Sequence, residues 1–127
     1  MAPDEDSLFD KRAADATLPR LRALILRLQE EALSEATDAG RQHLADAGRS
    51  NGSAEAAAAA MEAGARIQSI LDEIAGLGVI LRDLGTGLCD FPAQRDGEPV
   101  YLCWRLEEAE VRWWHPRDTG VAGRQPL

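Results

Sequence analysis

The chain has 127 residues, 45% of them hydrophobic, and this length suits one folded domain around one core. Its formal net charge of -8 repels phosphate backbones, so we expect no nucleic-acid partner. The chain contains no apolar run of roughly 18 residues, so we expect no membrane-spanning helix. The acidic start of the chain lacks the basic and apolar regions of a secretory signal, which predicts a cytoplasmic protein.

The first long helix is predicted over residues 8–47, where apolar residues recur with helical spacing. Thr17 is expected to cap its main part, with Pro19 in the first turn, where a missing N–H costs nothing. Residues 1–7 are polar and contain Pro3, so they are predicted to be disordered. The apolar stripe of this helix consists of Leu18, Leu21, Ile25, Leu28 and Ala32.

A second long helix is predicted over residues 53–84, after a turn cluster at residues 48–52. Its apolar seam has heptad spacing and consists of Ile67, Ile70, Ile74, Leu77, Leu81 and Leu84. Two long helices joined by a short turn form an antiparallel hairpin. Burial of one such seam does not offset the backbone entropy lost by a helix of this length. The hairpin therefore needs the rest of the chain, a second copy of the chain, or both.

The remainder of the chain changes from helical spacing to the two-residue alternation of strands. Residues 87–116 predict a three-stranded antiparallel β-meander, with a tight turn at Asp96 and Gly97. Residues 117–127 are expected to form an ordered tail. The predicted fold class is therefore α+β, an antiparallel helical hairpin packed on a C-terminal three-stranded β-meander, in one domain of residues 1–127.

The turn at Asp96 and Gly97 also predicts how the first two strands pair, and it places Asp90 opposite Cys103. The same register pairs Arg95 with Glu98, Phe91 with Leu102 and Cys89 with Trp104. An apolar side, expected to pack on the helices, then holds Cys89, Phe91, Val100, Leu102, Trp104, Val111, Trp113 and His115. A polar side holds Asp90, Tyr101, Cys103, Arg105, Arg112 and Trp114.

The C-terminal third contains motifs that resemble one protein family. They are Gly87-Leu88-Cys89-Asp90-Phe91-Pro92, Asp96-Gly97, Val100-Tyr101-Leu102-Cys103-Trp104, Trp114-His115 and Gly120-Val121-Ala122-Gly123-Arg124-Gln125-Pro126-Leu127. The family is the bacterial one catalogued as domain of unknown function 2203, and the resemblance covers nearly the whole chain. It implies a small cytosolic protein with a helical hairpin and a C-terminal β-region, and it implies no activity, cofactor or partner. Cys89 departs from the family pattern, in which an aliphatic residue is expected, and this weakens any site that requires a thiol there.

Asp90 and Cys103 form the first candidate site, because cross-strand neighbours have Cβ atoms about 4.5–5.5 Å apart. One interpretation is a ligand-binding or catalytic pair, with Arg112 setting the local charge. The other interpretation is structural, with Asp90 capping the turn before Pro92 and Cys103 packing as a small hydrophobic side chain.

Together with His115, Asp90 and Cys103 would supply the donor atoms of a three-ligand metal site. The predicted faces argue against this set, because His115 falls on the opposite side of the sheet from the other two. We therefore expect no metal and no cofactor, and we interpret His115 as a hydrogen-bonded structural residue at a strand end.

Two further features are candidates for ligand or partner contact. Tyr101 and Trp114 are expected to point outward beside arginines, which suits a ligand pocket or a protein interface; ordinary solvent-exposed packing is the alternative. In the tail, Arg124 and Gln125 are presented for contact, and a guanidinium can clamp an anion. The alternative is an ion pair between Arg124 and one of the 22 acidic residues.

The sequence contains no phosphate-binding glycine loop, zinc-protease helix motif or nucleophile elbow, and whether the chain is an enzyme stays open. The heptad seam and the outward aromatic surface favour a non-enzymatic interaction or assembly module that forms a homodimer. The alternative is a small-ligand or metal-dependent enzyme with its site on the β-meander and the tail. A regulatory partner of a larger complex is a third interpretation.

Overall fold

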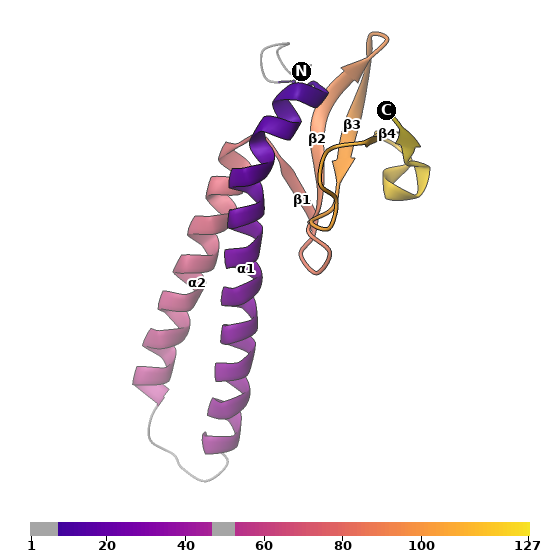
Figure 1. The fold of residues 1–127 in the computed structure, drawn as a ribbon. Coiled ribbons are helices and arrows are strands. Elements are labelled where there is room, and N and C mark those ends of the chain that lie inside the picture. The colour runs from indigo at the N-terminus through magenta and orange to yellow at the C-terminus, as the bar shows by residue number, and fades with distance from the viewer. Residues whose placement is uncertain (1–7, 47–52) are drawn as a thin grey trace.

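The structure is a computed structural model that describes residues 8–46 and 53–127. Two long helices precede a five-stranded antiparallel sheet whose strands lie in sequence order (Figure 1). The α+β class is confirmed, whereas the predicted number of three strands is wrong. The expectations for residues 1–7 and for the turn at 48–52 lie outside the described residues. The elements are α1 (Lys11–Asp46), α2 (Ser53–Gly76), β1 (Ile80–Asp83), β2 (Leu88–Arg95), β3 (Glu98–Trp104), β4 (Trp113–Pro116), the 3-10 turn η2 (Gly120–Gly123) and β5 (Gln125–Pro126).

The two helices lie side by side as an antiparallel hairpin (Figure 1). Arg20, near the start of α1, forms an ion pair over 2.8 Å with Glu73, near the end of α2. Further along the hairpin, Arg66 pairs with Glu31 over 3.1 Å. The end of the hairpin remote from the sheet projects beyond it (Figure 1). Neither described helix has the length and apolarity that crossing a membrane would require.

The first helix begins earlier than its predicted cap. Asp10 is the residue that caps it, because its Oδ1 accepts a hydrogen bond from the Ala13 N–H over 2.7 Å. Thr17 instead lies inside the helix and donates its hydroxyl to the Ala13 carbonyl over 2.9 Å. Pro19 is also internal, so the helix continues through a position where one backbone donor is missing.

The second helix ends at Gly76, not at residue 84 as the heptad spacing predicts. Gly78 has a φ of 84° and donates its N–H to the Ala75 carbonyl over 2.9 Å, which closes the helix in a left-handed turn. Leu81 and Leu84 still pack against the core, but from β1 and the turn that follows it. Over so few residues, helical and strand spacing overlap, which explains the error.

The pairing of β2 with β3 confirms the predicted register, with Asp90 opposite Cys103. The turn between them has positive φ at both central residues, 53° at Asp96 and 80° at Gly97, as a tight hairpin turn requires. The other confirmed pairs are Arg95 with Glu98, Phe91 with Leu102 and Cys89 with Trp104.

The hydrophobic core lies between the helices and one face of the sheet. The first half of α1 supplies one wall with Ala14, Leu18, Leu21, Leu24, Ile25 and Leu28, and the sheet supplies the other with Cys89, Phe91, Ala93, Val100, Leu102 and Trp104. Phe91 is fully buried and meets the ring of Phe9 edge-on, with centroids 5.1 Å apart. The opposite face of the sheet is therefore free to carry polar groups.

The start of β2 depends on a glycine, which gives a test of the fold. Gly87 has a φ of 68°, and an added Cβ would lie 2.7 Å from the Cβ of Leu106. We expect Gly87→Ala to lower the free energy of unfolding by about 2–4 kcal/mol, measured by urea denaturation. The matched control Gly64→Ala, where the new Cβ meets nothing within 4 Å, is expected to raise it by up to about 1 kcal/mol. Equal effects of the two substitutions would contradict this account.

Candidate functional site

The side chains of β4 point the opposite way from the prediction. Tyr101 pairs with His115 and Cys103 pairs with Trp113, so His115 and Trp113 lie on the polar side of the sheet. Trp114 turns toward the helices and packs against the core. The predicted faces of these three β4 residues are therefore wrong.

The loop before β4 explains the reversal. Residues 105–112 belong to no strand, and they are held by contacts to α1. Val111 is buried and donates its N–H to Asp15 Oδ1 over 2.8 Å, and Arg22 donates to the Leu106 carbonyl over 2.6 Å. Because residues 105–112 are not extended, the alternation counted from Val111 does not carry into β4.

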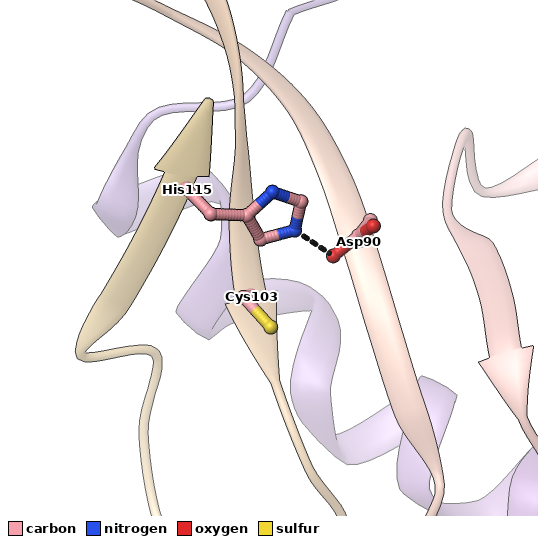
Figure 2. Close-up of side chains that lie close together, drawn as sticks. All are labelled: Asp90, Cys103 and His115. Carbon is pink, nitrogen blue, oxygen red and sulfur yellow. Dashed lines mark hydrogen bonds and ion pairs between the residues drawn. The ribbon is translucent and has the colours of Figure 1, made fainter. Parts of the chain in front are cut away.

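Three side chains consequently converge on the polar face from three neighbouring strands (Figure 2). Asp90 comes from β2, Cys103 from β3 and His115 from β4, and they are 4%, 0% and 1% exposed. One donor atom from each residue lies within 4.8 Å of the other two. The prediction that His115 lies apart from the other two is wrong.

Asp90 is the centre of the hydrogen bonding in this cluster. Its Oδ1 lies 2.9 Å from His115 Nε2, and its Oδ2 accepts a hydrogen bond from Arg82 Nε over 3.0 Å. The other ring nitrogen of His115, Nδ1, lies 2.7 Å from the Pro116 carbonyl. A carbonyl can only accept, so Nδ1 carries a proton.

The two ring contacts of His115 cannot both be made by a neutral imidazole beside an ionised carboxylate. A neutral ring has one N–H, and here each nitrogen faces an oxygen. One solution is a doubly protonated ring paired with Asp90, whose other oxygen is held by Arg82. A second solution is a neutral ring with a cation between Nε2 and its neighbours. The contact therefore requires either a proton between Nε2 and Asp90 Oδ1, carried by one of the two atoms, or a cation that neutralises them.

Cys103 is a buried thiol rather than a nucleophile. Burial raises the pKa of the Cys103 thiol to about 11, although the nearby Arg124 guanidinium works in the opposite direction. A nucleophilic cysteine needs an accessible thiolate, and it needs a histidine whose other nitrogen is held by the orienting acid. His115 instead uses Nδ1 on a carbonyl, so the cluster does not form a Cys–His–Asp catalytic triad.

The tail reaches back to the cluster through Arg124. Its Nη2 donates to the Cys103 carbonyl over 3.4 Å and to Glu108 Oε1 over 2.6 Å. Its guanidinium carbon lies 5.1 Å from the centroid of a Trp113 ring. Glu108 Oε1 also accepts the Arg105 N–H over 2.7 Å. Of the two interpretations of Arg124, the ion pair with an acidic residue is therefore present.

Tyr101 borders the cluster and is flanked by arginines. Its ring centroid lies 5.6 Å from that of His115. The guanidinium carbons of Arg82 and Arg117 lie 5.3 Å and 4.7 Å from the same Tyr101 ring. Tyr101 therefore lies beside both the buried cluster and two cationic groups, one of which, Arg82, also bonds Asp90.

The remaining candidate residues do not join the cluster. Arg112 is exposed and pairs with Glu110 over 2.8 Å. Gln125 is exposed on β5, where it pairs with Trp114. The structure thus groups Asp90, Tyr101, Cys103, His115 and Arg124, and leaves Arg112, Trp114 and Gln125 elsewhere.

Sequence reasoning missed three members of this site. Arg82 falls inside the predicted second helix, whereas the structure places it on β1, where its Nε bonds Asp90. Glu108 and Arg117 lie in irregular segments, where no periodic signal indicates which way a side chain points.

A comparison with protein-family models shows where this chain belongs. The family described as "Uncharacterized conserved protein (DUF2203)" matches residues 7–127. The chain is a member of this family. No curated protein and no solved structure matches it. Membership in the family confirms the resemblance drawn from the C-terminal motifs and adds no reaction, so the case for a function rests on the site.

The two thiols give a test of the burial that defines this site. Burial raises the pKa of Cys89 to about 12 and that of Cys103 to about 11, so both remain protonated at pH 8. We expect the folded protein to react with a disulfide reagent about a hundredfold or more slowly than the urea-unfolded chain. The rate should rise with pH between 7 and 9, as the thiolate fraction grows. Rapid reaction of either thiol in the folded protein would contradict the assigned burial.

Proposed function

We propose that the protein binds a divalent transition metal of the zinc class through Asp90, Cys103 and His115. The observation that carries the proposal is that the three donor atoms lie within 4.8 Å of one another in a buried cluster. Bonds of about 2.0–2.3 Å to a tetrahedral metal place donor atoms about 3.2–3.8 Å apart. His115 Nε2 and Asp90 Oδ1 are 2.9 Å apart and the donor separations extend up to 4.8 Å, so metal binding requires side-chain shifts of about an ångström.

The donor set and its surroundings suit such a metal. A thiolate, an imidazole and a carboxylate together favour zinc-class ions over magnesium or calcium, which prefer oxygen ligands. His115 has the arrangement common to metal-binding histidines, with Nδ1–H donated to a backbone carbonyl and Nε2 directed at the site. Three protein ligands leave a fourth position for water or a small molecule, as in catalytic zinc sites.

The charge balance also supports metal binding beside two arginines. In the metal-free cluster, one proton between His115 Nε2 and Asp90 Oδ1 and one on the Cys103 thiol are the two protons that a divalent ion would displace. Exchange of two protons for one doubly charged ion leaves the net charge of the site unchanged. The neighbouring Arg82 and Arg124 therefore do not repel the metal-bound site more than the proton-bound one.

Cobalt binding provides the direct test, because Co²⁺ occupies zinc sites and reports its ligands by absorption. We expect the purified full chain to bind one Co²⁺ with a thiolate-to-cobalt charge-transfer band, displaced by Zn²⁺. Cys103→Ala should abolish the band and weaken Zn²⁺ binding at least about a hundredfold. Cys89→Ala is the matched control, because Cys89 is equally buried but faces the core, and it should bind metal like the original protein.

Absence of bound cobalt, or equal loss in the two cysteine variants, would exclude this metal site. The cluster would then be explained by a proton shared between His115 Nε2 and Asp90 Oδ1. Circular dichroism of each variant separates loss of a ligand from loss of the fold.

We also propose self-association through α1 as a second function, because large apolar side chains are exposed on the hairpin. Leu26 is 49% exposed and Leu33 is 70% exposed, and their seven-residue spacing places them on one face of α1. Met61 on α2 is 76% exposed. Trp114 packs against the core and so does not belong to the predicted outward aromatic surface. The face of α1 with Leu26 and Leu33 therefore supports a homodimer better than the sheet does.

Light scattering at micromolar concentration tests this second function. We expect a mass twice that of the chain, and we expect the dimer fraction to rise with salt, because both copies are acidic. Leu33→Glu should give a monomer. Ser34→Glu, which adds the same charge at the position next to Leu33, should leave the dimer in place. If the unsubstituted protein is a monomer at low and at high salt, this interface is ruled out.

A further inference from the structure

Two arginines gather around Tyr101, although the whole chain has a net charge of -8. Arg82 and Arg117 both lie against its ring, with guanidinium carbons 5.3 Å and 4.7 Å from the centroid. The buried carboxylate of Asp90 balances only one of them, through Arg82 Nε. The residue next to Arg117, Asp118, forms no ion pair with it.

Both guanidinium groups keep donors for a further partner. Arg82 uses Nε on Asp90 and contacts the Tyr101 hydroxyl, so most N–H groups on its two terminal nitrogens remain, and its side chain is 44% exposed. Among the side chains that the structure describes, those of residues 8–37 and 54–127, Arg117 has no ion-pair or side-chain hydrogen-bond partner. Stacking on an aromatic ring restrains a guanidinium while leaving its edge available for an oxyanion.

We propose that Arg82 and Arg117, restrained by Tyr101, bind the oxyanion group of a small ligand beside Asp90, Cys103 and His115. The inference deepens the proposed metal site, on which it rests for the ligand's second contact. A metal held by Asp90 and His115 would lie next to this anion, because Arg82 bonds Asp90 and Tyr101 packs near His115. The fourth metal position and the arginines would then hold two ends of one ligand.

The charge of the molecule restricts the size of this ligand. A small carboxylate or phosphate-type anion interacts mainly with nearby charges, because more distant ones are screened beyond about 8–10 Å in ordinary salt. A nucleic acid would extend over the acidic remainder of the surface and be repelled. The structure therefore favours a low-molecular-weight carboxylate or phosphate-type compound over a polymer.

Calorimetric titration of the full chain with sulfate and with acetate tests the inference, in metal-free and in zinc-loaded protein. Sulfate represents tetrahedral oxyanions and acetate represents carboxylates, and both stay soluble with Zn²⁺. We expect at least one of them to bind, and Arg117→Gln to weaken it about tenfold. The matched control is Arg66→Gln, which removes the same charge from the helical hairpin, where Arg66 pairs with Glu31. It should leave anion binding unchanged.

The outcomes for anion and metal are separable. Failure of both anions to bind, or equal weakening in Arg117→Gln and Arg66→Gln, overturns the anion site and leaves the metal proposal standing. Anion binding that depends on Arg117 but occurs without any metal uptake supports the anion site and overturns the metal proposal. Tighter anion binding in zinc-loaded protein than in metal-free protein supports both together.

Discussion

The organisation of the sheet's polar face depends on one buried carboxylate. One oxygen of Asp90 on β2 accepts a hydrogen bond from Arg82 on β1, and the other contacts the ring of His115 on β4. A buried charge costs several kcal/mol unless partners compensate it, so this residue stabilises the fold only while both contacts are made. The strands on either side of the central β2–β3 pair are thus joined by side chains as well as by their backbone ladders.

This arrangement makes structural and ligand-binding roles compatible. The same contacts that compensate Asp90 also orient the donor atoms of a site, because His115 is held by the Pro116 carbonyl and Cys103 lies on the strand between them. A site placed on paired strands is held more rigidly than one placed on loops. The tail adds a further restraint, since Arg124 bonds Glu108 and covers Trp113.

Local chemistry was enough to predict the centre of the sheet. The turn at Asp96 and Gly97 requires two residues with positive φ, and once it is placed, every pair of β2 and β3 follows, including Asp90 opposite Cys103. Arg82 could not be found in the same way. Its segment continues the apolar spacing of α2, and only the left-handed turn at Gly78 separates helix from strand.

The position of His115 was beyond local reasoning for a different physical reason. Strand alternation has a period of two, so one non-extended residue in a connection reverses every side chain after it. The connection before β4 takes its path from α1, through the Val111 contact to Asp15 and the Arg22 contact to Leu106. Those partners lie 84 or more positions away in sequence. Tertiary contacts therefore determine on which face of the sheet His115 lies. They also determine whether His115 is an isolated structural histidine or part of a three-residue site.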